Sequence, residues 1–248
     1  MGRPVVLTTI ALHADGTAVL APHVDLRVAP DTSADTLRAC ARDADGIIVR
    51  SKLPDDICDH APKLKAMVRH GVGLDFIPVT AATARGIAVA NLPGSNAQAV
   101  AEYCISALMH LRRPLSSVDA TMRAQGWLKA RIAPEGFSEL GGSTLGIIGV
   151  GTIGRKVARI AQGFGMTVLG VSRRGVMPEG VEAVSLADLC TRSHAVVVSC
   201  ALTDETKGLL SAAMIARLRP DAIVINVSRG AVIDTHALVD ALMARRLG

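Results

Sequence analysis

Short apolar runs rich in β-branched residues alternate with segments of helical periodicity over the first ninety residues. Continuous apolar runs of this kind are typical of parallel strands buried on both faces. We predict strands at 5–8, 46–49, 64–69 and 87–90, and helices at 33–44 and 78–85. Ser33 or Thr32 is the expected N-cap of the first helix, and Gly86 the expected stop of the second. The pattern predicts a small parallel α/β unit.

The same alternation starts again after a long helical segment. A helix is predicted at 97–112, ended by Pro114, and a further helical stretch contains Met122 and Trp127 before an irregular region through Pro134. Beyond it we predict strands at 143–148, 167–171, 195–200 and 222–226, and helices at 154–164, 186–191, 212–218 and 235–246. Two α/β domains follow, residues 1–97 and 98–248, linked by the helix after Asn96.

Composition narrows the possible functions. Of 248 residues, 50% are hydrophobic and only 2% aromatic, so the core must be aliphatic. The net charge of +5 comes from scattered arginines, and side chains that could stack on bases are scarce, which argues against a nucleic-acid partner. A small anionic substrate or cofactor accounts for the charge equally well.

The cysteines and the N-terminal sequence indicate the compartment in which the protein is expected. Five cysteines stand at irregular spacings without a C-x-x-C pair, so we expect reduced thiols, at least four of them small core residues. We see no secretion signal and no apolar stretch long enough to span a bilayer. We therefore expect a cytoplasmic protein without a metal site.

A glycine-rich loop follows the strand predicted at 143–148. Gly149-Val150-Gly151-Thr152-Ile153-Gly154 fits G-x-G-x-x-G, with a buried strand before it and a helix after it. Gly149 allows a tight turn, Gly151 lets the backbone approach a pyrophosphate, and Gly154 lets helix and strand pack closely. The helix N-terminus would offer N–H groups to the phosphates. Nucleotide binding is the favoured interpretation, and a purely structural turn is the alternative.

The end of the next strand predicts which nucleotide binds. An NAD site usually has an acidic residue there, which bonds the ribose hydroxyls. This chain has Ser172, Arg173 and Arg174 instead, and guanidinium groups can grip a 2′-phosphate. We predict NADP(H) over NAD(H); the alternative is that both arginines are solvated loop charges and either cofactor binds.

Together with the glycine loop, three segments resemble one family. They are RHGVGLDFI at 69–77, PGSN…VAE at 93–102 and INVSRGAVID at 225–234. This chain resembles the D-isomer-specific 2-hydroxyacid dehydrogenases, most closely the phosphoglycerate and hydroxypyruvate/glyoxylate branches, over nearly its whole length and in the expected order. The resemblance implies a flavodoxin-like substrate domain, a Rossmann domain, and a cleft between them. It also implies hydride transfer between NAD(P)H and a small D-2-hydroxy or 2-keto acid.

The resemblance assigns roles to individual residues. Arg229 matches the catalytic arginine, which pairs with the substrate carboxylate and polarises the neighbouring carbonyl. The loop His70-Gly71-Val72-Gly73 matches the segment whose backbone N–H groups hold that carboxylate. Arg50 matches an arginine used on the substrate phosphate. The implied cofactor-binding residues are Val100, Gly149, Gly151, Thr152, Ile153, Gly154, Ser172, Arg173, Arg174, Cys200, Val227 and Ser228. A homodimer, formed through the Rossmann domain and the helix around 109–122, is also implied.

The chain departs from the family pattern at three places. Ala201 stands where the family usually has proline, and the acidic residue expected at Ser172 is absent, as in NADP-using branches. The family continues beyond the position of Gly248 with a catalytic Glu and His. Reduction of a keto acid needs such a proton donor, and His70 alone lies beside the substrate loop, where a backbone-bonded loop histidine is the plainer interpretation. We therefore expect little or no turnover, from a fragment or from a nucleotide-binding remnant.

Overall fold

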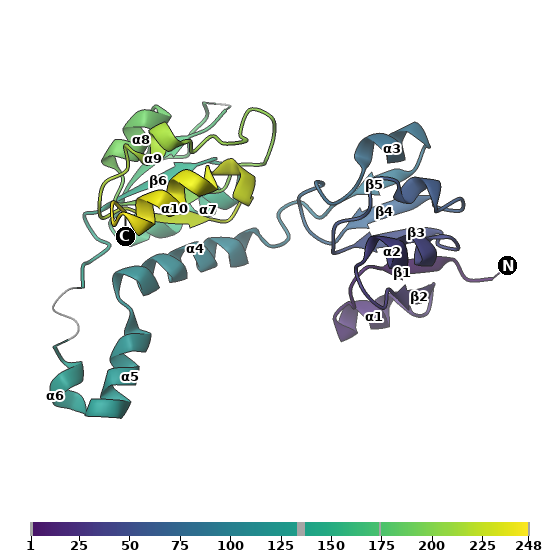
Figure 1. Ribbon diagram of the computed structural model, residues 1–248, viewed down its shortest axis with the longest axis horizontal. Helices are drawn as coiled ribbons and strands as arrows, with labels where there is room; N and C mark the ends of the chain where they lie inside the picture. Colours follow the sequence, from purple (N-terminus) through teal and green to yellow (C-terminus); the bar gives the residue numbers. More distant parts are fainter. Residues whose placement is uncertain (1, 133–136, 174, 248) are drawn as a thin grey trace. The chain divides into compact units, whose positions relative to one another are not determined.

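The computed structural model describes residues 2–132, 137–173 and 175–247. The chain divides into two compact units, Met1–Ser95 and Asn96–Gly248, each built around its own sheet (Figure 1). Both sheets are five-stranded and parallel throughout. The predicted α/β class with two parallel-sheet domains is confirmed.

The first unit has a flavodoxin-like sheet. Its strands are β1 (Val5–Thr8), β2 (Asp25–Val28), β3 (Gly46–Val49), β4 (Ala66–Arg69) and β5 (Ala88–Ala90), in the order β2-β1-β3-β4-β5. Its helices are α1 (Ala14–Leu20), α2 (Ala34–Ala41), the 3-10 turn η1 (Ile57–Asp59) and α3 (Val79–Ala84). The order matches that of the flavodoxin-like doubly wound fold, in which the first strand marks the switch between the two directions of winding.

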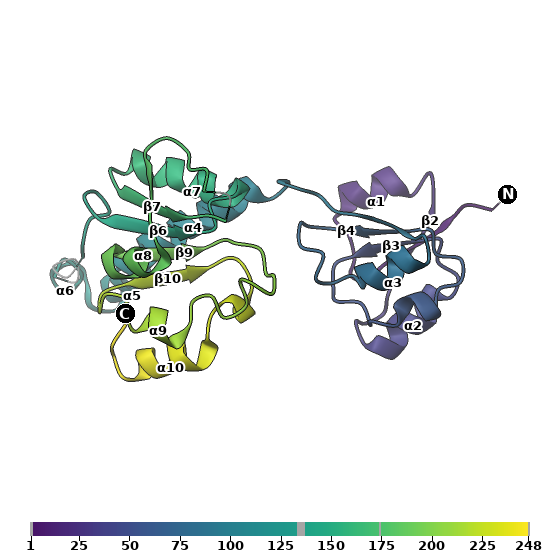
Figure 2. The same cartoon turned by 90° about the horizontal axis from the view of Figure 1, so that it is seen from above.

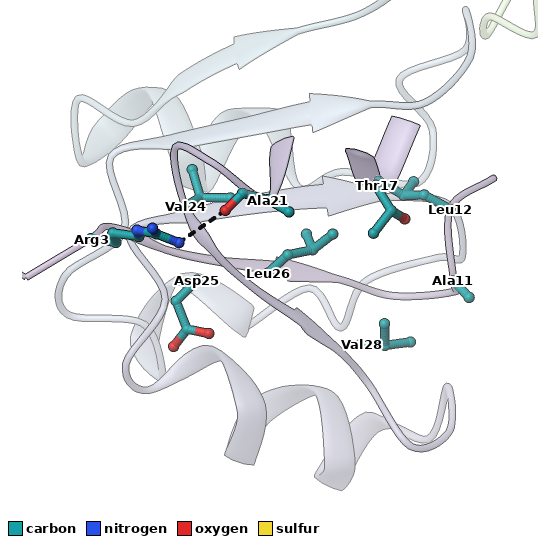
Figure 3. Close-up of a pocket in the computed structure, with 9 residues that line it drawn as sticks. All are labelled: Arg3, Ala11, Leu12, Thr17, Ala21, Val24, Asp25, Leu26 and Val28. Carbon is teal, nitrogen blue, oxygen red and sulfur yellow. Dashed lines mark hydrogen bonds between the residues drawn. The ribbon is translucent and has the colours of Figure 1, made fainter. Parts of the chain in front are cut away.

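The core of this unit lies on one face of the sheet. Leu7, Ile47 and Met67 are at most 1% exposed there and pack with Leu37 of α2 and Ala82 of α3. Figure 2 shows α1 on the opposite face. No described residue of α1 is buried, and a hollow of about 490 Å³ separates this helix from β2 (Figure 3). The hollow contains none of the predicted site residues.

The sequence pattern missed two elements of this unit. Residues 9–32, where no helix or strand was predicted, contain helix α1 and strand β2. Helix α1 buries nothing, and β2 is an edge strand that carries the ion pair between Asp25 and Arg27. Neither therefore has the apolar periodicity by which elements are recognised in a sequence.

The second unit has the sheet order β10-β9-β6-β7-β8. Its strands are β6 (Thr144–Ile148), β7 (Thr167–Val171), β8 (Val181–Ala183), β9 (Ala195–Val198) and β10 (Ile223–Asn226). Its helices are α4 (Ala97–Arg112), α5 (Leu115–Gln125), α6 (Trp127–Ala130), α7 (Thr152–Gly163), α8 (Leu186–Arg192), α9 (Ala212–Ile215) and α10 (Thr235–Met243), with a 3-10 turn η3 at Gly230–Val232. The short edge strand β8 was not predicted.

Two separate apolar layers cover the two faces of this sheet. Helices α4 and α7 pack on one face, where Cys104, Leu145 and Val157 are fully buried. Helices α8, α9 and α10 cover the other (Figure 2), with Leu189 and Val198 in that layer. Both layers are almost entirely aliphatic, as the composition required.

Helices α5 and α6 form an arm that extends away from the rest of the second unit (Figure 1). We use "the arm" for residues 115–130. No described residue of α5 is buried, and Leu115, Trp127 and Leu128 are 67%, 63% and 73% exposed. Three large apolar side chains are thus left in solvent on one protruding element.

His194 holds the start of β6 through its side chain. The Thr144 backbone N–H donates a hydrogen bond of 3.0 Å to His194 Nδ1, so the imidazole accepts there and is neutral. Burial lowers the pKa of His194 below its usual value of 6.5; the charges of Arg219 and Arg112 lower it further, and Asp221 opposes them. Protonation of Nδ1 would remove the acceptor.

We expect His194 to make the stability of the protein depend on pH. Above pH 6.5, the ordinary value, the imidazole is neutral folded and unfolded and its contribution is complete. As the pH falls, the unfolded chain takes up the proton first, so the free energy of unfolding decreases until the pH reaches the lowered folded pKa. Urea unfolding between about pH 8 and pH 5 measures this. His194→Asn keeps an acceptor without titrating and should lose that part of the pH dependence; identical profiles for both proteins would contradict the assignment.

Candidate nucleotide and substrate sites

The carboxyl ends of three strands meet at the glycine-rich loop of the second unit. Ile148 of β6 pairs in register with Val171 of β7 and with Val198 of β9. All three strands therefore end at the same edge of the sheet. There the Gly149 N–H donates to the Val171 carbonyl, and the Ser199 hydroxyl donates to the Gly149 carbonyl. In open parallel sheets, ligands bind at this edge where the winding reverses.

Each of the three motif glycines has a different environment. Gly149 has φ +96°, and a Cβ there would lie 2.6 Å from the Cys200 Cα. A Cβ on Gly154, in the first turn of α7, would lie 2.5 Å from the Gly149 carbonyl oxygen. A Cβ on Gly151 would meet nothing within 4 Å. Two glycines therefore permit close backbone packing, and the third leaves open space at the N-terminus of α7.

The N-terminal turn of α7 begins with Thr152 and Ile153, directly after the extended residue Gly151. Thr152 is exposed and Ile153 half-buried. The helix has twelve residues, and the N–H groups of its first turn have no partner within the helix, which suits a phosphate.

The chain after β7 carries a half-buried Ser172 and an exposed Arg173; Arg174 lies outside the described residues. The pKa of the Glu205 carboxyl is lowered, chiefly by the Thr203 hydroxyl that donates to it and in smaller part by the charge of Arg173. The charge of Arg173 thus acts on Glu205, in the loop that follows β9.

The predicted residues after β9 and β10 are bonded to one another. The Ser228 hydroxyl donates to the Cys200 carbonyl, and the Val227 N–H donates to the Val198 carbonyl. Cys200 is half-buried, and burial raises the pKa of its thiol. These contacts bring Cys200, Val227 and Ser228 together beside the glycine loop.

Asn226 positions the backbone of Arg229, a role that the sequence analysis missed. Its Oδ1 accepts the Ser228 N–H at 2.9 Å, and its Nδ2 donates to the Arg229 carbonyl at 2.9 Å. The Arg229 side chain is half-buried and donates from Nη1 to the Ser228 carbonyl. Asn226 is the last residue of β10, and an asparagine side chain commonly bonds the backbone two residues further on.

The predicted substrate loop of the first unit follows β4. His70 is exposed, its N–H donates to the Val49 carbonyl, and Gly71 has φ +151°. Within the described part of the chain, the N–H groups of Val72 and Gly73 donate to no protein acceptor. The two adjacent donors are thus available to a ligand.

The carbonyls of the same loop are all bonded, three of them by Arg69 and Asn91, which the sequence analysis did not single out. Arg69 donates to the carbonyls of His70 and Gly73, at 3.1 and 3.2 Å. Asn91 Nδ2 donates to the Val72 carbonyl at 2.7 Å. The Gly71 carbonyl accepts the Leu92 N–H at 2.9 Å.

Arg50 leaves the carboxyl end of β3 in the same unit and is half-buried. The backbone N–H groups of Arg50 and Ser51 both donate to the buried Thr9 hydroxyl, each at 2.9 Å. The Arg50 guanidinium donates from Nη1 to the Ala11 carbonyl. Val100, predicted to line the cofactor site, lies half-buried in the first turn of α4.

Over residues 2–132, 137–173 and 175–247, no cluster of three or more His, Cys, Asp or Glu side chains could hold a metal ion. None of the helices there has both the length and the apolar character needed to cross a membrane.

A known family matches this chain. The family model described as D-isomer specific 2-hydroxyacid dehydrogenase, NAD binding domain, matches residues 105–248. These residues include the glycine loop and Arg229.

Individual relatives agree with that match. A D-3-phosphoglycerate dehydrogenase of Mycobacterium bovis is 36% identical over 98% of this chain and 46% of its own length. This chain therefore spans about half the length of that relative. A glyoxylate reductase of Thermococcus kodakarensis is 35% identical over 97% of this chain and 76% of its own length.

Among solved structures, an NADPH-dependent glyoxylate/hydroxypyruvate reductase of Sinorhizobium meliloti in complex with NADP and malonate has a TM-score of 0.86 at 28% identity. The match covers 99% of this chain and 77% of that chain.

Proposed function

Because this chain belongs to the D-isomer specific 2-hydroxyacid dehydrogenase family, we propose that it binds NADP(H) and exchanges hydride with a small D-2-hydroxy acid or 2-keto acid. The observation that carries the proposal is the glycine loop at the carboxyl edge of the second sheet, with open space at Gly151 and an unpaired helix N-terminus behind it. When bound, the nicotinamide supplies the hydride chemistry.

Preference for NADP(H) over NAD(H) is supported by the residues after β7. No carboxylate stands at 172–174, so nothing there bonds both ribose hydroxyls or repels a 2′-phosphate. Arg173 is exposed and can reorient to form paired hydrogen bonds with a phosphate. Arg174 belongs to the same proposal on its sequence position alone.

For the acid substrate, we propose that the N–H groups of Val72 and Gly73 bind the carboxylate. Arg229, whose backbone Asn226 fixes, pairs with substrate oxygens and stabilises the negative charge that develops on the carbonyl. Arg50 is the proposed partner of a second anionic group, such as a phosphate. The family relatives named above act on substrates of this class, which supports the assignment.

A second candidate function, nucleotide binding without turnover, is favoured by where the histidines lie. His13 caps α1, His60 pairs with Asp56, and His194 accepts the Thr144 N–H. His110 and His236 lie on helices α4 and α10. His70 is the one histidine within the described substrate loop, and its side chain is exposed. A buried, oriented proton donor beside the substrate is what the reduction needs.

Calorimetric titration with NADPH and NADH tests the cofactor proposal. We expect NADPH to bind at least about tenfold more tightly, and the preference to disappear in a variant with Arg173→Ala and Arg174→Ala. Arg159→Ala, an exposed arginine on α7, is the matched control and should bind like the parent. Tighter binding of NADH would refute the preference.

The same complex separates the two candidate functions. Glyoxylate or hydroxypyruvate is added to the NADPH complex, and the absorbance of NADPH is followed. Steady oxidation supports the dehydrogenase, whereas binding with little or no oxidation supports the second candidate.

We also propose a homodimer that covers the exposed apolar side chains of the arm. Sedimentation velocity should give the mass of two 25.8 kDa chains, because solvent contact with Leu115, Trp127 and Leu128 favours burial against a second copy. Leu115→Asp together with Leu128→Asp should shift the protein to the mass of one chain. Val19→Asp, an equally exposed apolar site on α1, should leave the mass unchanged; a parent that sediments as one chain refutes the dimer.

A further inference from the structure

We infer that Arg69 and Asn91 are positioning residues for the substrate loop, because together they bind three of its four carbonyls while two of its N–H groups stay available to a carboxylate. The inference rests on the proposed function and adds to it two residues that lie outside the substrate loop, residues 70–73.

Each of the four carbonyls in this loop accepts a hydrogen bond from the protein. Arg69 bonds two of them, at His70 and Gly73, and Asn91 bonds that of Val72. The Leu92 N–H bonds the fourth, at Gly71. Of the four N–H groups, those of His70 and Gly71 are used within the protein. Two N–H groups are left without a protein partner while every carbonyl already accepts a bond, so the loop as folded favours an anion over a cation.

The Arg69 guanidinium fixes the loop because it bonds on several sides at once. Nη1 also donates to the Val49 carbonyl at the end of β3, at 2.8 Å, and Nε reaches Gly73. The guanidinium lies over the Phe76 ring, 4.5 Å from its centroid, which sets its plane. A Cβ on Gly71 would lie 3.4 Å from Arg69 Cζ, so the loop wraps closely around the group.

Lysine could not replace this arrangement. A guanidinium has donors fixed in a plane, so Nε and Nη1 can bond carbonyls in different directions, whereas an ammonium is a single point of attachment. Arg69→Lys keeps the charge and the aliphatic stem but releases the carbonyl of His70 or of Gly73. The released peptide unit adjoins one that carries a ligand-binding N–H, of Val72 or of Gly73, and its rotation shifts that neighbouring donor.

The amide resonances of Val72 and Gly73 provide the test. The 248-residue protein, labelled with ¹⁵N, is titrated with glyoxylate, and the two N–H signals are followed. We expect both to move downfield in the parent as they donate to the carboxylate. In Arg69→Lys and in Asn91→Ala the apparent Kd for glyoxylate should rise at least about tenfold, while NADPH affinity stays at the parent value.

Arg27→Lys is the matched control, since Arg27 is an exposed arginine of the same unit that pairs with Asp25; it should titrate like the parent. If Arg69→Lys does not fold, Asn91→Ala tests the inference by itself. That substitution removes a single side-chain hydrogen bond, the one to the Val72 carbonyl. Parent-like glyoxylate affinity in a folded variant of either residue overturns its positioning role and leaves the proposed function intact. Parent signals that do not respond to glyoxylate, with NADPH still bound, overturn both the loop assignment and this inference.

Discussion

Gly151→Ala is expected to weaken NADPH binding on the order of 100-fold while leaving the folded protein unchanged. A Cβ at this position meets no protein atom within 4 Å, and Gly151 has φ −88° and ψ −154°, an extended conformation open to alanine. The added methyl group therefore costs the protein nothing. It instead occupies the space through which a pyrophosphate would approach the backbone at the start of α7.

Calorimetry with NADPH, alongside urea unfolding, checks this result. Gly163→Ala is the matched control, because a Cβ there also meets nothing within 4 Å and the residue lies at the other end of α7. The control should bind NADPH like the parent. Equal NADPH affinity in Gly151→Ala and Gly163→Ala would contradict the proposed position of the phosphates.

Gly149→Ala is expected to destabilise the second unit by about 3–5 kcal/mol. Two costs add: a left-handed backbone at φ +96° disfavours any residue with a Cβ, and the new atom would lie 2.6 Å from the Cys200 Cα. Because that neighbour is backbone at the end of β9, relief requires the strand itself to move, which would break its pairing with β6.

Urea unfolding measures this loss, and Gly163→Ala again serves as the control. Alanine in place of that glycine should be neutral or stabilise the helix by up to about 1 kcal/mol. A Gly149→Ala protein within about 0.5 kcal/mol of the parent would show that the turn can relax without moving β9.

The central strands of both sheets and the edge strands β5 and β10 could be predicted, whereas peripheral elements that bury little could not. Strands β1, β3 and β7 and helix α4 have the predicted bounds, because each buries a continuous apolar run or stripe. The missed elements α1, β2 and β8 lie at the periphery. Helix α7 begins at Thr152, two residues before its predicted start: Gly151 is the extended N-cap, and the motif glycine Gly154 lies inside the helix.

In the candidate sites, the motif residues could be located, but those that hold them could not. The spacing of the glycines at 149, 151 and 154 is by itself enough to indicate a nucleotide-binding loop. Arg69, Asn91 and Asn226 bond backbone carbonyls and N–H groups, and such partners have no spacing rule. A signal was present for Asn226 and Asn91, since each is an asparagine at the end of a strand, where side-chain turns are common.

The exposed position of Trp127 affects how this protein can be studied. It is the only tryptophan in the chain, it lies on the arm, and it is 63% exposed. Both cores are aliphatic, so tryptophan emission carries no signal from either. The emission wavelength of Trp127 and its quenching would instead report whether the arm is covered. A thermal melt followed by tryptophan fluorescence would therefore report on the arm and would not detect unfolding of the two sheets.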